Sequence, residues 1–137
     1  MPVTRLAFPR PLADELIRQA FRSPRVEVCG LISGDANGFK RCFPVANVAA
    51  NPERRFEMDP RGQIDALHAM AQLGEELRAI YHSHPNGPAH PSDTDVDQHQ
   101  YPDTYYLIIS LARPVRPELR AFLIRGGSFN EVSLDFS

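Results

Sequence analysis

Apolar and polar residues alternate along the chain with two different periods, and these periods predict its elements. Leucine, isoleucine and alanine recur at helical spacing over Pro11–Arg22, which predicts a helix that begins at a proline and ends before Ser23-Pro24. A second helix is predicted over Pro60–Leu73, ended by Gly74. The buried face of this second helix is expected to carry Ile64, Leu67, His68 and Ala71.

Extended segments with a period of two predict the strands. Val26–Ser33 is apolar on both alternating sets, which is typical of a central strand covered on both faces, and the turn residues after it predict a hairpin into Phe39–Val48. Leu77–Ser83 is the next strand, and a loop rich in proline and glycine separates it from a short helix over Ser92–His99. The order α-β-β-α-β-α-β-β-β predicts one mixed α/β domain over residues 1–137. Its three closing strands are expected at Thr104–Ala112, Glu118–Arg125 and Phe129–Phe136.

Composition and charge narrow the class of protein. The 137 residues are 42% hydrophobic and 23% charged, which is ordinary for one globular domain. A net charge of −2 offers no basic face for nucleic acid or for an acidic membrane. The N-terminal stretch lacks the apolar core of a signal peptide, and the longest apolar run, Leu107–Ile109, is far too short to span a bilayer. With only Cys29 and Cys42, both in apolar contexts, we expect buried thiols and a cytoplasmic protein.

Histidine and aspartate are concentrated in one short stretch of the chain. Side chains two apart on an extended backbone point the same way, so a strand that ends at His82-Ser83-His84 places both imidazoles on one face. Asp95 follows eleven residues after His84 and can supply an oxygen ligand, and a His-His-Asp set with one position left for water suits a catalytic Zn²⁺ site. A His-x-His pair in a strand also arises without any metal, so this pair alone leaves both interpretations open.

Two further residues each have a structural and a chemical interpretation. Ser92 with an acid three residues later resembles a capping box at a helix start, which requires no chemistry but is compatible with a role for Ser92 in a site. Glu27 interrupts the apolar strand Val26–Ile32, where an unpaired ion would be costly to bury. Glu27 either forms a salt bridge with Arg25 or another arginine, or serves as a general base and proton shuttle beside a zinc-activated water.

These residues together resemble the JAMM motif of the MPN domain family of zinc metallopeptidases. The resemblance implies a single MPN domain with a cytidine-deaminase-like layout, in which helices flank a curved β-sheet. The chain is similar to the compact bacterial members of the Mec type, which process sulfur-carrier proteins. The motif positions are Glu27-x-Cys29-Gly30-Leu31, His82-Ser83-His84-Pro85 and Pro91-Ser92-x-x-Asp95, with eight positions from His84 to Ser92 and three from Ser92 to Asp95.

The resemblance also implies a role for each motif residue. Two imidazoles and one carboxylate would bind Zn²⁺, a second carboxylate would take a proton from water and hand it to the departing amine, and a hydroxyl would donate to the oxyanion. In that order, the residues are His82, His84 and Asp95 as metal ligands, Glu27 as the general base and Ser92 as the oxyanion donor.

Other residues near the motif are expected to have supporting roles. Small residues at Cys29 and Gly30 would let the substrate backbone or the zinc-binding loop approach closely. The remaining histidines, His68, His90 and His99, have no place in the motif and are expected to lie on the surface or in packing positions.

The activity that the resemblance implies is hydrolysis of a peptide or isopeptide bond after the C-terminal Gly-Gly of a ubiquitin-like sulfur-carrier protein. The 137 residues are taken up by core elements, without the inserted segments by which larger relatives grip two ubiquitins. The alternatives are a deubiquitinase-like isopeptidase acting on other conjugates and a non-catalytic MPN scaffold. A zinc deaminase is set aside because the sequence has no Cys-x-x-Cys. The oligomeric state stays open.

Overall fold

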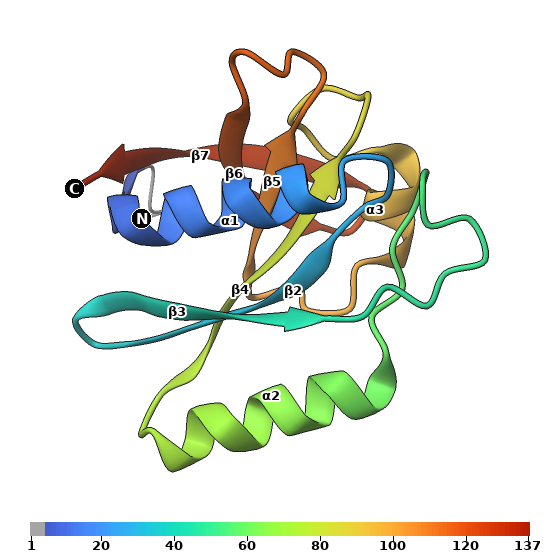
Figure 1. The fold of residues 1–137 in the computed structure, drawn as a ribbon. Coiled ribbons are helices and arrows are strands. Elements are labelled where there is room, and N and C mark those ends of the chain that lie inside the picture. The colour runs from blue at the N-terminus through green and yellow to red at the C-terminus, as the bar shows by residue number, and fades with distance from the viewer. Residues whose placement is uncertain (1–4) are drawn as a thin grey trace.

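The computed structural model describes residues 5–137 as a seven-stranded mixed sheet with a long helix on each face (Figure 1). Residues 1–4, part of the stretch in which no signal peptide was expected, lie outside the described residues. The strand order is β1-β7-β6-β5-β4-β2-β3, and the expected α/β architecture is confirmed. The elements are β1 (Arg5–Phe8), α1 (Arg10–Arg22), β2 (Cys29–Asp35), β3 (Gly38–Val45), α2 (Pro60–Gln72), β4 (Glu76–His84), α3 (Asp93–Gln98), β5 (Tyr105–Ser110), β6 (Glu118–Arg125) and β7 (Ser128–Phe136).

Strand β4 lies in the interior of the sheet. It pairs antiparallel with β2 and parallel with β5, so neither of its edges is open. Its side chains alternate between the two faces of the sheet: Ala79 and Tyr81 pack in the core beneath α1, whereas Ile80 packs in the core beneath α2. His82 and His84 continue the Ile80 series to the end of the strand. They therefore lie on the α2 side of the sheet.

The buried face of α2 differs from the prediction. Ala66 and Met70 are the buried residues of this helix, whereas Ile64 is 52% exposed and the side chains of His68 and Ala71 are also exposed. Of the expected set only Leu67 packs at the edge of the core. The helix carries apolar residues on more than one side, so its helical period was correct but did not determine which side packs against the sheet.

The first strand was not predicted. Arg5–Phe8 pairs parallel with β7, and Phe8 is fully buried, with its ring centroid 5.1 Å from that of Phe39 and 6.3 Å from that of Phe136. Four residues before a proline are too short to establish an alternating pattern, so only tertiary pairing reveals this strand. Within residues 5–137, no helix is both long and apolar enough to cross a membrane.

Candidate active site

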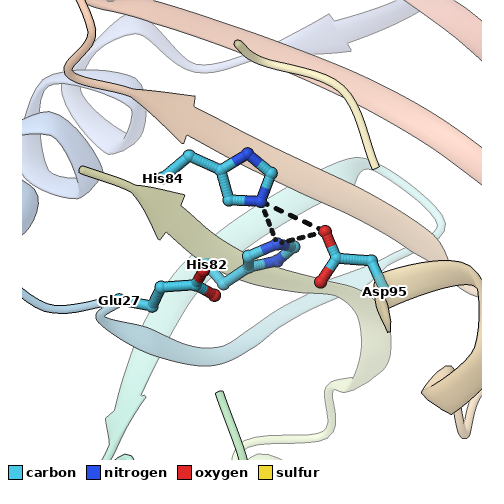
Figure 2. A group of neighbouring side chains, drawn as sticks. All are labelled: Glu27, His82, His84 and Asp95. Carbon is cyan, nitrogen blue, oxygen red and sulfur yellow. Dashed lines mark hydrogen bonds and ion pairs between the residues drawn. The ribbon is translucent and has the colours of Figure 1, made fainter. Parts of the chain in front are cut away.

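The end of β4 brings two imidazoles together, as the alternation of the strand predicted. His82 lies opposite Cys29 of β2 and Ile108 of β5, and its side chain is fully buried. His84 lies opposite Ser110 at the last paired position of the strand. The Nε2 atoms of His82 and His84 are 3.1 Å apart, and both rings point toward the same space (Figure 2).

Asp95 reaches this space from the first turn of α3. Its Oδ2 lies 3.1 Å from Nε2 of His82 and 3.1 Å from Nε2 of His84. The same oxygen accepts a hydrogen bond from the backbone N–H of Ser92, whose Oγ in turn accepts one from the N–H of Asp95. The capping box expected at this helix is therefore present, and it orients Asp95 toward the histidines. Burial by itself raises the pKa of Asp95, but His82, His84 and the Ser92 N–H outweigh it and hold that pKa below its ordinary value.

Glu27 completes the group from the segment that leads into β2. The expectation that Glu27 interrupts a strand was wrong. Strand β2 begins at Cys29, so Glu27 lies two residues before its first residue. Its backbone N–H donates to the carbonyl of Pro52 at 2.7 Å. Ser83 secures the next residue, since its Oγ accepts from the N–H of Val28 at 2.9 Å and its own N–H donates to the carbonyl of Val28 at 3.0 Å.

The carboxylate of Glu27 is buried and has an unused oxygen. Among residues 5–137, no arginine pairs with Glu27, which removes the salt bridge with Arg25 as an explanation for this acid. Its Oε1 has no hydrogen-bond partner in the described chain. Burial raises the pKa of Glu27, and the nearby His82 and His84 offset part of that rise. A buried acid with an unpaired oxygen is the kind of group that a ligand or water in the site would satisfy.

The donor set fits a metal ion. One ligand atom from each of Glu27, His82, His84 and Asp95 lies within 4.8 Å of the others, and all four side chains are buried. Nδ1 of His84 lies 2.8 Å from the carbonyl oxygen of Pro88, which only accepts, so Nδ1 carries the proton and Nε2 presents its lone pair to the group. A catalytic site for a metal such as zinc has three protein ligands and one open position. Two imidazole nitrogens and a carboxylate oxygen form such a ligand set.

Two residues that support the site were not found from the sequence. Phe56 stacks on His82, with ring centroids 4.4 Å apart and an interplanar angle of 24°. The side chain of Asn47 makes four hydrogen bonds: Nδ2 donates to the carbonyls of Glu27 (2.9 Å) and Arg55 (3.0 Å), and Oδ1 accepts from the N–H groups of Ala49 and Glu57, each at 3.0 Å. Asn47 thus fixes the loop that carries Phe56 to the backbone of the candidate base. The only sequence signal was an amide beside a polar loop, which has no specific meaning.

The expectation for Cys29 and Gly30 needs correction. A Cβ at Gly30 would lie 2.4 Å from the carbonyl oxygen of Phe43 and 2.6 Å from Oη of Tyr81, so this glycine makes room for the sheet beneath α1 rather than for the zinc-binding loop or a substrate. Sγ of Cys29 donates to the carbonyl of Val45 at 3.4 Å, and burial raises the pKa of this thiol to about 12. Cys29 is a core residue.

The other histidines lie outside the group, as expected. His68 is exposed on α2. The ring of His90 stacks on Phe129 with centroids 6.2 Å apart. Nδ1 of His99 lies 2.6 Å from the carbonyl oxygen of Val96, where the ring packs near the C-terminal end of α3.

A buried His-His-Asp-Glu group at the end of an interior strand, next to the capped start of a short helix, is the arrangement expected of a hydrolase of the JAMM type. Residues 9–125 match the family described as prokaryotic homologs of the JAB domain, and the chain belongs to that family. The resemblance found in the motif is thereby confirmed, as are the fold and the hydrolase class that it implied.

Individual relatives agree with this assignment. The chain is 34% identical over 116 residues to a desampylase of Haloferax volcanii, an alignment that covers 80% of this chain and 84% of that protein. It is 32% identical over 122 residues to a CysO-cysteine peptidase of Mycobacterium tuberculosis, covering 88% and 83%. A solution structure of a protein from Desulfitobacterium hafniense superimposes with a TM-score of 0.85 at 32% identity, covering 96% of this chain and 92% of that one.

Proposed function

We propose that this protein is a zinc-dependent peptidase of the cytoplasm that hydrolyses the bond after the C-terminal Gly-Gly of a ubiquitin-like sulfur-carrier protein. The observation that carries the proposal is the convergence of His82, His84, Asp95 and Glu27 within 4.8 Å in a buried group. The relatives named as a CysO-cysteine peptidase and a desampylase support the same class of substrate. An intact ligand set favours an enzyme over a non-catalytic scaffold.

In this mechanism His82, His84 and Asp95 hold the metal, and Glu27 moves the proton. A bound zinc ion supplies Lewis-acid chemistry that acidifies water and polarises the scissile carbonyl. Glu27 Oε1, which has no other hydrogen bond in the described chain, accepts the proton of the attacking water and returns it to the departing amine. The backbone contacts of Glu27 with Pro52 and Asn47 hold its carboxylate in place during both transfers.

Ser92 can cap α3 and stabilise the oxyanion at the same time. Its Oγ accepts the N–H of Asp95, and in residues 5–137 its own hydroxyl proton donates to no other group. That proton is available to the oxygen on which negative charge develops. A preorganised donor of this kind lowers the barrier by about 2.7–4 kcal/mol.

A Gly-Gly terminus suits the approach to such a buried group. Glycine has no Cβ, so a diglycine segment could lie extended close to the residues that would hold the metal, with no side chain in the way of its carbonyl. The alternative substrates are isopeptide conjugates of other proteins, which would present a lysine side chain on the leaving side.

The proposal is tested by metal analysis and by competition between substrates. Purified protein is expected to contain about one zinc per chain, since three protein ligands suffice for a catalytic site. Sulfur-carrier proteins extended past Gly-Gly by one or a few residues are then offered beside linked ubiquitin dimers, and intact-protein mass spectrometry follows the masses. Cleavage of the dimers with the extended carriers untouched would overturn the substrate assignment. A protein free of any divalent metal after gentle purification would overturn the zinc mechanism.

A further inference from the structure

A cavity of about 470 Å³ lies beside the metal-ligand group. Asp95 and Thr94 of α3 line one part of it, and the loop before α2 and the end of α3 supply other walls. Its apolar lining comes from Phe56, Met58, Ile80, Tyr101 and Tyr106. This volume lies within the range of about 300–1,000 Å³ that is usual for sites that bind small molecules. It is suited to a single residue with its side chain and is too small for a folded protein.

Arg55 places a positive charge at this cavity without an internal partner. The residue is half-buried, and its Nε is fully buried with no hydrogen-bond partner. Its Nη2 donates to Oε1 of Gln98 at 3.1 Å, which is a neutral contact that orients the guanidinium from α3. Among residues 5–137, no carboxylate forms an ion pair with Arg55. A partly desolvated guanidinium with an unused N–H is expected to have an anionic partner.

The acids that share the cavity do not supply that anion. Asp95 lines the cavity, but its Oδ2 is committed to His82, His84 and the N–H of Ser92. Glu57 also lines it and is exposed, and its carboxylate does not pair with the guanidinium of Arg55. A bound ligand is therefore the remaining source of an anion at this cavity. Because the guanidinium presents paired N–H donors in a plane, a carboxylate is the anion of a peptide substrate that it fits best.

The chemistry of a Gly-Gly substrate indicates which part of it carries the carboxylate. The diglycine itself has no charge and no side chain, so it needs neither this volume nor a cation. A residue attached after Gly-Gly has both a side chain and, when it ends the chain, a free α-carboxylate. Resting on the proposed function, we propose that the cavity is the pocket for this leaving residue and that Arg55 binds its C-terminal α-carboxylate.

This assignment makes the enzyme selective for trimming the end of a carrier. In a protein joined to Gly-Gly through an internal lysine, the lysine α-carboxyl is part of a peptide bond and carries no charge. Such a substrate offers Arg55 no carboxylate to bind. The free-energy cost of desolvating the guanidinium is then not offset. The cavity thus favours an adduct of one residue over a protein conjugate.

The test uses two carriers that differ by one charge. One ends in Gly-Gly-Ala with a free carboxylate, and the other ends in the same sequence as a C-terminal carboxamide; kcat/KM is measured for each with the zinc-loaded enzyme. The wild type is expected to prefer the carboxylate by about 10- to 100-fold, the range for a hydrogen bond to a charged group. The Arg55→Gln variant is expected to bring the ratio of the two kcat/KM values near one. Arg54→Gln is the matched control, because this neighbouring arginine is exposed and lies outside the cavity lining.

The outcomes separate this inference from the proposed function. Equal cleavage of the two carriers by the wild type, or a preference that survives in Arg55→Gln, overturns the role of Arg55 and leaves the peptidase activity standing. Cleavage of neither carrier by zinc-loaded wild type overturns the proposed function and this inference with it. An equal loss on both carriers in Arg55→Gln marks Arg55 as a structural residue.

A binding measurement keeps the inference testable if Arg55→Gln does not fold. The ¹⁵N-labelled, zinc-loaded Glu27→Gln variant, which retains the ligands but not the base, is titrated with the peptide Gly-Gly-Ala and with its amide. The Nε–H resonance of Arg55 is expected to shift with the free peptide and much less with the amide. A resonance that does not respond to the carboxylate overturns the assignment.

Discussion

Ser92 and Asp95 bond to each other twice: the N–H of Ser92 donates to Asp95 Oδ2 at 2.9 Å, and the N–H of Asp95 donates to Ser92 Oγ at 3.1 Å. The Asp95 Oδ2 that accepts the N–H of Ser92 in this capping box also faces both imidazoles. Folding of α3 and assembly of the ligand group therefore depend on the same four atoms.

Replacing Asp95 with Asn separates these two tasks. The amide oxygen of the new side chain can still accept from the N–H of Ser92, so the cap and the metal-free melting temperature are expected to change little. The ligand charge is lost, and zinc affinity is expected to fall by more than about 100-fold, beyond the usual cost of losing a residue that only supports a ligand. Titration against a chelator of known affinity gives the zinc affinity. Unchanged zinc affinity would show that Asp95 is only a cap.

Glu27→Gln is expected to keep the fold and about one zinc per chain, because it removes the base without removing one of the three proposed ligands. Turnover should fall by about 10²- to 10⁴-fold, the usual contribution of a positioned general base. Kinetics and elemental analysis on the same sample provide the check. A variant that turns over like the wild type would assign Glu27 a purely structural role.

Ser92→Ala and Ser92→Gly together distinguish the oxyanion role from the cap. Loss of one oxyanion donor is expected to lower kcat by about 10²- to 10³-fold in both variants. Alanine should also destabilise the helix start by about 1 kcal/mol, whereas glycine should cost only about a few tenths of that. Thermal unfolding and kcat are measured for each. If kcat follows stability, with glycine close to wild type, Ser92 serves only as a cap.

Asn47→Asp tests whether this side chain positions the base. The substitution keeps the size of the side chain but removes both N–H donors to the carbonyls of Glu27 and Arg55. We expect kcat to fall by about 10- to 100-fold with little change in zinc content, the range for residues that orient a metal site from outside. Asn51→Asp, in the same loop but exposed, is the control. A loss of folded protein without a change in kcat per zinc would contradict positioning.

The two thiols are expected to be unreactive in the folded protein. Burial raises the pKa of Cys29 to about 12 and that of Cys42 to about 11. A thiol is deprotonated only as the pH approaches its pKa, so at pH 8 about one Cys42 in a thousand, and fewer for Cys29, is thiolate. Mass spectrometry after iodoacetamide should show no labelling at pH 8 and two labels in denaturant. Rapid native labelling of Cys29 would contradict the burial of its thiol.

The convergence of His82, His84 and Asp95 could be predicted because their arrangement depends on local rules. The alternation of a strand puts His82 and His84 on one face, and a capping box fixes Asp95 relative to Ser92. Both rules act over a few residues. The resemblance to a known motif then linked them to the distant Glu27.

The remainder of the site depends on contacts that no local pattern encodes. Asn47 acts through hydrogen bonds to residues 20 and 8 positions away, and Phe56 meets His82 only when the loop folds over the sheet. The proposed binding role of Arg55 depends on the cavity that it lines, which the sequence does not reveal. The prediction of which face of α2 is buried was wrong for the same reason. An apolar residue such as Ile64 fits the helical period equally well whether it points to the sheet or to solvent.

The position of Ser83 between the two histidines has a consequence for how this protein could diversify. Because alternation sends its side chain to the opposite face, Ser83 holds the backbone on either side of Glu27 while its neighbours face the metal site. The backbone around Glu27 and the two imidazoles are thus held by one tripeptide of β4, His82–His84, whereas Asp95 comes from α3. Loops around the His-His-Asp-Glu group can be exchanged, lengthened or grafted from a relative while the spacing between Glu27 and the two imidazoles stays constant.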